Sequence, residues 1–375
     1  MIMQTDILIA GGGLAGLTAA LHLQRAGLDV LVIEKNGYPQ QKVCGEYISN
    51  EVLPYLHWLE ADPSVLAPAE IKRLRFTDRS QKSITTKLPM GGFGVSRFSL
   101  DNFLYQKFVA KGGIVIHDSV ISIKSAEFFT IETRSGKVIN AKKVIGAYGK
   151  RSGLDLQLNR SFIEKRSPYL AVKAHYAGSF EEDLVGLYTY QGGYCGVSTI
   201  ENGKLNICYL ADYNSFKQHK SIEAYQEKVM YQNAALKQIF ENSKCLFDQP
   251  MTVSQLSFGS RPAVENHILM AGDTAGLIHP LCGNGMSMAI HSAKICAELL
   301  IDWFETQQST VAFEKNYMAM WKNEFKSRLK MGSLLSAVLR KESLSDLVMR
   351  GLICMPGLLP IIIKKTHGKT LTTQV

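Results

Sequence analysis

The chain has 375 residues, 46% of them hydrophobic and 20% charged, and its formal net charge is +9. This composition indicates a globular protein with a large core, and the dispersed basic residues without a nucleic-acid module argue against nucleic acid as a partner. Seven cysteines without a C-x-x-C pair predict free thiols in a reducing cytoplasm, and no metal site.

The first predicted unit is strand, glycine turn, helix and strand over residues 6–34. Residues 6–10 and 30–33 are short apolar runs typical of buried parallel strands. Between them stands a G-x-G-x-x-G pattern formed by Gly11, Gly13 and Gly16. In such a pattern the first glycine permits the turn, the second lets backbone approach a pyrophosphate, and the third allows close packing of helix on strand.

Glu34 ends the second of these strands. A carboxylate there accepts hydrogen bonds from both hydroxyls of an adenosine ribose and repels a 2′-phosphate. The helix N-terminus also offers free N–H groups and a partial positive charge to the phosphates. The unit therefore predicts a site for FAD or NAD rather than NADP.

The next segments are predicted as loop, hairpin, loop and helix. Residues 35–53 are read as loop and turn, and 71–88 as a hairpin whose polar turn spans 77–82. Residues 91–94, Gly-Gly-Phe-Gly, are expected to be loop, and a helix is expected near 100–109.

Three strand-like runs lead into a second lobe; they cover 114–116, 128–133 and 137–145. Residues 160–257 show the alternation of an antiparallel sheet, assigned to substrate and interrupted by one amphipathic helix over about 222–240. The first lobe then resumes with a buried strand at 268–271 and a helix over about 286–300.

The tail contains an uncharged stretch, 351–363, broken by Pro356 and Pro360. It is too short to span a bilayer. Two alternatives stay open: a lid packed on the core, or a segment dipping into a membrane surface with Lys364 and Lys365 beside it.

Three separated segments carry a family resemblance: the fingerprint at 6–34, Gly-Ala-Tyr-Gly-Lys-Arg-Ser at 146–152, and Gly-Asp-Thr-Ala-Gly followed by Pro-x-x-Gly-x-Gly within 272–285. Together they resemble the flavoprotein superfamily of aromatic hydroxylases (p-hydroxybenzoate hydroxylase-like) and geranylgeranyl reductases. The resemblance implies an α/β fold: a Rossmann-like (GR2-type) FAD-binding domain, an inserted antiparallel β-sheet substrate domain and a helical C-terminal tail.

The domain boundaries expected from it are 1–70 plus 95–155 plus 260–305 for FAD, 71–94 plus 156–259 for substrate, and 306–375 for the tail. In this family Asp273 would bind the ribityl chain, and the loop and helix start near 283–286 would lie along the flavin ring. The implied cofactor-binding residues are Gly11, Gly13, Leu14, Ala15, Gly16, Glu34, Lys35, Lys42, Cys44, Arg97, Tyr148, Gly149, Gly272, Asp273, Pro280, Gly283, Asn284, Gly285 and Met286.

The middle motif departs from the family at Tyr148, where the hydroxylases carry an aspartate linked to flavin and pyridine-nucleotide handling. Direct reduction by NAD(P)H is therefore in question, and either transient NAD(P)H or a redox partner would supply electrons. The Cys-Gly loop at Cys44 resembles the loop beside the flavin in geranylgeranyl reductases. We take Cys44, Glu46 (as a proton donor) and Tyr194 (as a substrate contact) as candidate catalytic residues.

The resemblance implies an FAD-dependent oxidoreductase, and three functions stay open. The first is a monooxygenase that hydroxylates or epoxidises a lipophilic or carrier-bound small molecule through a flavin C4a-hydroperoxide. The second is a reductase or dehydrogenase of carbon–carbon double bonds, and the third is a non-catalytic flavin or electron-relay protein. The expected partners are a lipophilic substrate, a redox partner or acyl carrier, and a membrane surface touched by the tail.

Overall fold

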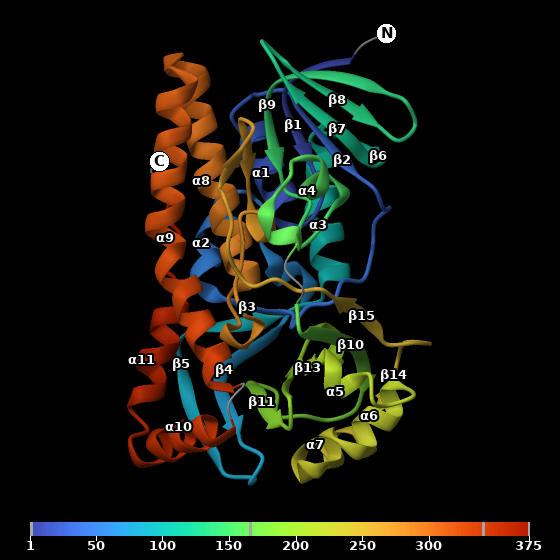
Figure 1. The fold of residues 1–375 in the computed structure, drawn as a ribbon. Helices are drawn as coiled ribbons and strands as arrows, with labels where there is room; N and C mark the ends of the chain where they lie inside the picture. Colours follow the sequence, from blue (N-terminus) through green and yellow to red (C-terminus); the bar gives the residue numbers. More distant parts are fainter. Residues whose placement is uncertain (1–2, 165–166, 340–341, 374–375) are drawn as a thin grey trace.

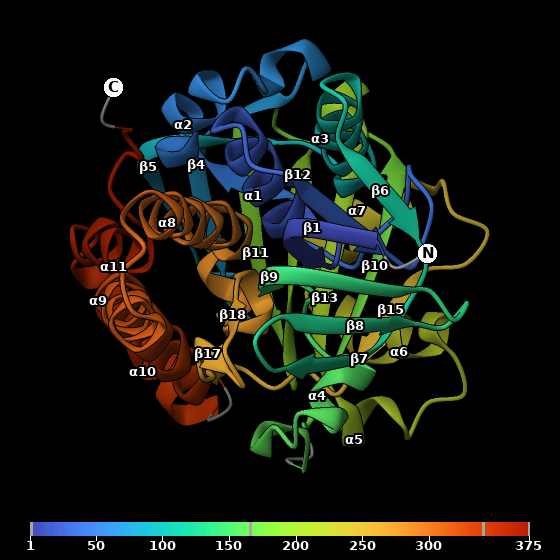
Figure 2. The same cartoon turned by 90° about the horizontal axis from the view of Figure 1, so that it is seen from above.

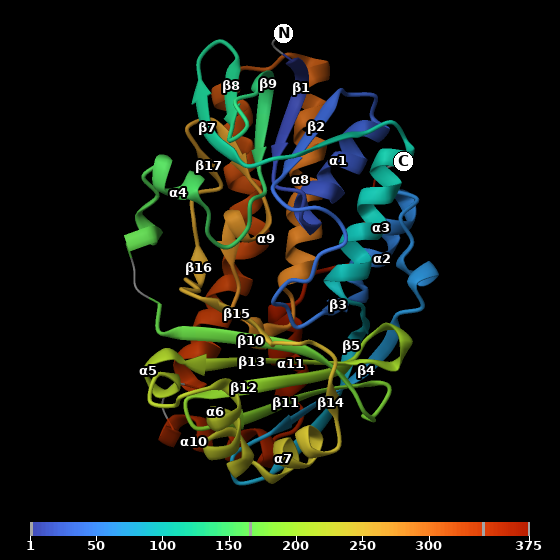
Figure 3. The same cartoon turned by 90° about the vertical axis from the view of Figure 1, so that its right-hand side faces the viewer.

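The computed structural model describes residues 3–164, 167–339 and 342–373. Its two large β-sheets are stacked end to end, with helices on one side of the first sheet and on the outer face of the second (Figures 1 and 3). The predicted fold class is confirmed by this arrangement.

The first sheet follows the strand order β17-β18-β9-β1-β2-β6, and β1 lies between β2 and β9. Its parallel strands are β1 (Met3–Ala10), β2 (Val30–Glu34), β6 (Ile114–His117), β9 (Val138–Gly146) and β18 (Ile268–Met270). Antiparallel additions are β7 (Val120–Ser125), β8 (Phe129–Thr133) and β17 (Val264–Glu265). The carboxyl ends of β1, β2, β9 and β18 therefore meet at one edge.

Three helices cover one face of this sheet: α1 (Leu14–Arg25), α3 (Arg97–Ala110) and α8 (Gly285–Thr306). Figure 2 shows α1 lying between α3 and α8 above the strands. Because apolar side chains of α1 and β1 pack together without exposure, the glycine turn between them is held rigidly. Shorter helices are α2 (Leu53–Trp58) and α4 (Gly153–Gln157).

The second sheet follows the order β14-β10-β13-β12-β11-β4-β5-β3. Its strands are β3 (Tyr47–Ser49), β4 (Ala69–Thr77), β5 (Ser83–Gly94), β10 (Tyr169–Ala177), β11 (Leu184–Tyr190), β12 (Gly193–Thr199), β13 (Leu205–Asp212), β14 (Lys244–Cys245) and β15 (Met251–Ser254), which pairs with β10. Its outer face is covered by α5 (Tyr213–Phe216), α6 (Ile222–Lys228) and α7 (Ala234–Glu241), so its inner face is directed at the first sheet (Figure 3). A small separate ladder joins β16 (Gly259–Ser260) to β19 (Gly276–Leu277).

The C-terminal region is helical, as α9 (Thr310–Leu339), α10 (Glu342–Cys354) and α11 (Leu358–Thr366). Helix α9 runs beside α8, and α10 and α11 pack against β5 of the second sheet (Figure 1). Pro360 is tolerated because it lies in the first turn of α11, where backbone N–H groups have no intrahelical acceptor. Among the described residues, none of the helices combines the length and apolar character that crossing a bilayer requires.

Several local predictions were wrong, and each has a physical reason. Residues 91–94 belong to β5, where glycine is required because a Cβ at Gly94 would collide with the Thr199 carbonyl oxygen. The single helix predicted over 222–240 is divided by a 3-10 turn at Met230–Gln232, and Asn233 begins α7 by accepting from Ala235 N at 3.1 Å.

The second sheet also differs from the prediction of an antiparallel sheet, because β4 and β11 pair in parallel. Strand β7 was missed, and β3 forms within the predicted loop 35–53. The domain boundaries stay a prediction, from which β3 departs: it lies within 1–70 but pairs with β5 in the second sheet.

Candidate functional site

A cavity of about 750 Å³ lies between the two sheets. It begins at the glycine turn before α1, passes the carboxyl ends of the parallel strands, and continues between the inner face of the second sheet and helices α9 to α11. A site at the strand ends of an open parallel sheet is the usual position for a bound nucleotide.

The end of the cavity at α1 is built for an anion. Gly13 is the N-cap of α1 and has no side chain to satisfy the first N–H groups of the helix. A Cβ at Gly13 would meet only the Arg97 Nη2 and Lys42 Nζ atoms, both at 3.6 Å. Arg97 is fixed by two hydrogen bonds of 2.7 Å to Asp101, and burial lowers the pKa of Lys42. Helix N-terminus and cations thus converge where a pyrophosphate would lie.

Glu34 lies beside this end and is buried. Its Oε2 accepts from Gly12 N at 2.8 Å and its Oε1 accepts from Asn36 N at 3.1 Å. Each carboxylate oxygen keeps a further lone pair, which is what two ribose hydroxyls require. Tyr38 donates to the Gly12 carbonyl and stacks on Tyr105 at 4.2 Å between ring centroids, which closes this side of the turn.

Three predicted cofactor residues do not line the cavity. Gly11 and Gly16 serve the packing of the turn, because a Cβ at Gly16 would collide with the Gly11 carbonyl oxygen and one at Gly11 with the carbonyl of Ala147. Asn284 is fully buried and directs its amide nitrogen at the Glu51 carboxylate, 3.4 Å away. The sequence could identify these positions by motif but not the direction in which each one points.

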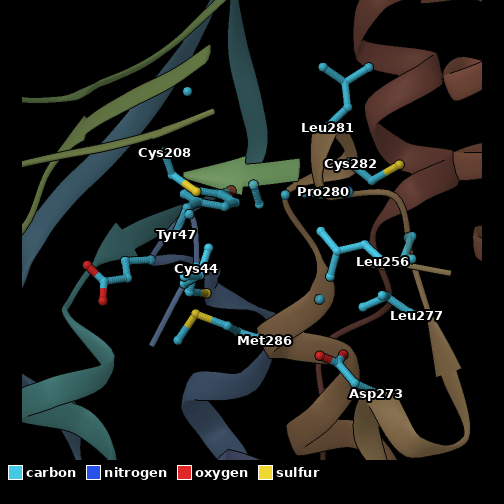
Figure 4. A pocket seen from close by; sticks show the side chains of 18 of the residues that line it. Cys44, Tyr47, Cys208, Leu256, Asp273, Leu277, Pro280, Leu281, Cys282 and Met286 are labelled. Atoms are coloured by element: carbon cyan, nitrogen blue, oxygen red, sulfur yellow. The ribbon is translucent and has the colours of Figure 1, made fainter. Parts of the chain in front are cut away.

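The remaining predicted cofactor residues all line the cavity: Gly13, Leu14, Ala15, Glu34, Lys35, Lys42, Cys44, Arg97, Tyr148, Gly149, Gly272, Asp273, Pro280, Gly283, Gly285 and Met286. Figure 4 shows Asp273, Pro280 and Met286 with Cys44 and Tyr47 nearby. Residues Lys150 and Gln40 also line it and were not predicted.

Tyr148, the residue that departs from the hydroxylase pattern, is packed rather than free. Its hydroxyl contacts the Met270 sulfur at 3.5 Å, and burial raises its pKa. The next residue, Gly149, donates its N–H to Thr274 Oγ1 at 2.9 Å. This hydrogen bond joins the segment after β9 to the loop after β18, although the chain lacks the aspartate that the hydroxylases carry at position 148.

Glu46 is the centre of a buried charged cluster. Its Oε1 accepts from Lys173 Nζ at 2.9 Å and from Arg97 N at 2.8 Å, and its Oε2 accepts from His175 Nε2 at 2.7 Å. The Glu46 and Lys173 side chains have no solvent exposure. Glu46 also lines the cavity, and among the described residues its Oε2 accepts from His175 alone, so its role as a proton donor stays a prediction.

Sequence reasoning missed Lys173 and His175, because they lie in an apolar stretch read as an ordinary strand. Strand alternation was the signal that could have found them: Ala171, Lys173 and His175 share the face of β10 opposite to the helices α6 and α7. Two ionisable side chains on the inward face of a strand require a buried partner.

Thiols and a phenol lie farther along the cavity, with Cys208 and Tyr194 on the second sheet and Cys282 in the turn before α8. Burial, and then Cys44, raises the pKa of Cys208 to about 12, and burial raises that of Cys282 to about 12. Burial also raises the pKa of Tyr194, whose ring lies 5.9 Å from that of His279. Burial lowers the pKa of His279 to about 4. These groups are neutral at physiological pH.

The half of the cavity farthest from α1 is apolar. Its walls come from strands of the second sheet and from the C-terminal helices, through Leu74, Phe76, Leu88, Val185, Leu187, Leu335, Val338, Val348, Leu352, Leu359, Ile362 and Ile363. The C-terminal region is thus part of the cavity wall. A lid packed on the core was one of the two alternatives for residues 351–363, whereas the contribution of α9 was not predicted.

These features fit FAD: a glycine cradle, a ribose-binding acid, cations at a helix N-terminus, and an aspartate with a glycine loop at the start of α8. The sequence model of the family "FAD dependent oxidoreductase" matches residues 6–46. The fold and the site define an FAD-dependent oxidoreductase.

Relatives that match over most of the chain agree with this class. The chain is 24% identical over 321 residues to a menaquinone reductase of Mycobacterium tuberculosis, covering 79% of this chain and 76% of that one. It is 26% identical over 345 residues to a digeranylgeranylglycerophospholipid reductase of Methanosarcina acetivorans, covering 84% and 80%. It is 24% identical to the FAD-dependent monooxygenase penM of Penicillium crustosum, covering 81% and 71%.

Among solved structures, the flavin-dependent brominase Bmp2 aligns with a TM-score of 0.81 at 17% identity, covering 97% of this chain and 93% of that one. A geranylgeranyl bacteriochlorophyll reductase-like protein from Thermoplasma acidophilum aligns with a TM-score of 0.75 at 19% identity, covering 100% and 94%. The relatives of this FAD-dependent oxidoreductase chain thus include both geranylgeranyl reductases and flavin monooxygenases.

Proposed function

We propose that the protein is an FAD-dependent monooxygenase that hydroxylates or epoxidises an elongated lipophilic molecule. The observation that carries the proposal is the cavity itself, which joins the FAD site to an apolar chamber. An apolar chamber keeps water from the reacting centre, and this protects oxygen chemistry from side reactions.

Bound FAD would supply the redox chemistry, and the chain's own residues would place the reactants. Gly13, Arg97 and Lys42 would hold the pyrophosphate, Glu34 the ribose and Asp273 the ribityl chain. Leu187 of β11 and Leu352 of α10 would hold the apolar part of the substrate and exclude water.

Reduction of a carbon–carbon double bond is the second candidate, supported by the reductases among the relatives. That reaction needs a proton donor as well as a hydride. Glu46 is held by Lys173 and His175, and burial raises the pKa values of Cys208 and Tyr194, so that both groups keep their protons. Cys44, Cys208 and Tyr194 all line the cavity and are the candidate proton donors of such a reductase.

The electron source follows from the same site. We propose that NAD(P)H binds transiently or that a redox partner delivers electrons, because the chain has one dinucleotide fingerprint and Tyr148 in place of the hydroxylase aspartate. The substrate would be a free lipid-like molecule or one carried by an acyl carrier.

The test uses the purified holoprotein. NADPH or NADH is added under nitrogen, and the flavin absorbance is followed; then a lipophilic phenol such as 4-dodecylphenol is added with labelled oxygen. We expect substrate-dependent oxygen uptake and one labelled oxygen atom in the product. Turnover of an unsaturated lipid with oxygen excluded would refute the monooxygenase and support the reductase. A flavin that stays oxidised with both nucleotides would assign reduction to a partner protein.

We also propose that the outer face of α10 and α11 contacts an anionic membrane, from which a lipophilic substrate would enter. Its exposed apolar side chains are Leu344, Leu347, Ile353, Met355, Leu358 and Ile361. Arg350, Lys364 and Lys365 are exposed beside them, and residues 347–375 contain no Asp or Glu. Basic residues around an apolar face are the pattern of interfacial helices. The inner faces of the same helices line the cavity, through Leu352 and Ile363.

A further inference from the structure

The loop that carries Asp273 depends on its backbone to place that residue. Asp273 lines the cavity, and Figure 4 shows its carboxylate directed into it. No group in the described part of the chain donates a hydrogen bond to this carboxylate. Its position is therefore set by the short 3-10 turn Gly272–Thr274, whose Gly272 N–H donates to Ser292 Oγ at 2.7 Å.

Arg261 holds the backbone of this loop from the side away from the cavity, which it does not line. Its Nη1 donates to the Asp273 carbonyl oxygen at 3.0 Å, and its Nη2 donates to the Ser257 carbonyl oxygen at 3.1 Å. Its backbone N–H donates to the Ala275 carbonyl oxygen at 3.0 Å, next to the ladder of β16 and β19. Arg261 thus contacts the loop on both sides of Thr274.

The guanidinium of Arg261 is buried without an ion pair to any carboxylate of the described residues. It lies over the Phe162 ring, with 3.7 Å between its central carbon and the ring centroid. Burial lowers the pKa of Arg261 to about 10 and the charge of Asp273 opposes this shift, so the group stays charged at neutral pH. A buried charge is costly unless polar partners compensate it, and here these partners are loop carbonyl oxygens.

A second buried arginine secures the next residue of the loop. Arg160 Nη1 donates to the Thr274 carbonyl oxygen at 3.0 Å and to Asp155 Oδ1 at 3.0 Å. Its Nη2 donates to the Pro262 carbonyl oxygen at 3.1 Å. Two consecutive carbonyl oxygens of the loop, those of Asp273 and Thr274, are therefore each held by a guanidinium.

We propose that Arg261 is a positioning residue for FAD, which fixes the Asp273 backbone so that the Asp273 carboxylate meets the ribityl hydroxyls. The rigid fork of a guanidinium sets direction as well as distance. A group that is already ordered binds its ligand more tightly, because no ordering cost is left for the binding step. The inference rests on the role that the proposed function gives to Asp273, and it concerns the ribityl end of the site alone.

The test compares FAD with ADP as ligands of the full chain, freed of flavin by dialysis against potassium bromide. ADP has the adenosine and pyrophosphate groups but no ribityl chain, so it reports on the end of the site at α1 and on folding. We expect Arg261→Leu to weaken FAD binding about tenfold and to leave ADP binding within about twofold of the wild type. Arg261→Lys, which keeps the charge and can donate to one carbonyl, should recover part of the loss.

A double variant tests whether Arg261 acts through Asp273. Asp273→Ala should itself weaken FAD binding, and adding Arg261→Leu should cause no further loss, because the carboxylate to be positioned is gone. Lys143→Leu is the matched control. Lys143 of β9 is also a buried cation over an aromatic ring, 4.0 Å from the Trp303 centroid, but it does not line the cavity. This control should bind both ligands like the wild type.

Three results overturn the inference: FAD binding unchanged in Arg261→Leu, equal losses for FAD and ADP, or additive losses in the double variant. If Arg261→Leu yields no folded protein, Arg261→Lys must show a loss for FAD that is absent for ADP. FAD binding unchanged in Asp273→Ala would refute the role of Asp273 in the proposed function and this inference with it. No turnover is measured, so a failure of the monooxygenase reaction leaves the result intact.

Discussion

Replacing Glu46 by Gln tests whether this buried residue is structural or catalytic. The substitution keeps the shape but removes the charge, and it leaves the buried Lys173 ammonium with neutral acceptors, the new amide oxygen and Gln41 Oε1, which is 3.0 Å away. The new amide group would also face His175 Nε2, a donor 2.7 Å from the present carboxylate. Removing one partner of a buried pair costs about 3–5 kcal/mol, a large part of the stability of an ordinary domain.

The assay is thermal unfolding of the holoprotein at fixed FAD concentration, together with the FAD content after gel filtration. We expect Glu46→Gln to lower the melting temperature and to release FAD, because Arg97 N loses its carboxylate acceptor at 2.8 Å. The double variant Glu46→Gln, Lys173→Met should lose less stability than the sum of the two single variants, since it leaves no unpaired charge. If Glu46→Gln melts and binds FAD like the wild type but turns over slowly, the residue is a proton donor after all.

Two further predictions concern packing and the membrane. Gly16→Ala should yield protein without FAD, because its Cβ collides with the Gly11 carbonyl oxygen, whereas Gly37→Ala, with no atom within 4 Å, should retain the flavin spectrum. Leu358→Glu with Ile361→Glu should abolish co-sedimentation with phosphatidylglycerol vesicles. The control Leu156→Glu, at an exposed leucine of α4, should sediment like the wild type. Two results would show that this face binds something other than lipid. Either Leu358→Glu with Ile361→Glu leaves the sedimentation with vesicles unchanged, or the double substitution abolishes a self-association of the protein.

Local pattern was sufficient to predict the nucleotide end of the site. The glycine turn and Glu34 are adjacent in space because they are adjacent in the strand–helix–strand unit. The cluster at Glu46 could not be predicted in this way, because Lys173 and His175 come from a strand more than a hundred residues away. Their partners are set by the stacking of two sheets, which periodicity does not encode.

The tail illustrates the same limit on a larger scale. The apolar composition of 351–363 left two alternatives open, a lid packed on the core and a segment that dips into a membrane surface. In the structure, Leu359 and Ile363 line the cavity while Leu358 and Ile361 face outward. The inward face of α11, which packs against β5, fits the lid, and the membrane contact of the outward face stays a proposal.

The central place of β1 in the first sheet bears on how the chain folds. One edge of β1 pairs with β2, but the other pairs with β9, which joins Met3 to Ile139 and Ala10 to Gly146. Pairings so distant along the chain form late and slowly. A peptide limited to residues 6–46 would carry the whole dinucleotide fingerprint, yet one edge of β1 would stay unpaired and open to aggregation. The nucleotide-binding unit therefore does not fold on its own. Its glycine turn is complete only after β9 has been synthesised and has paired with β1.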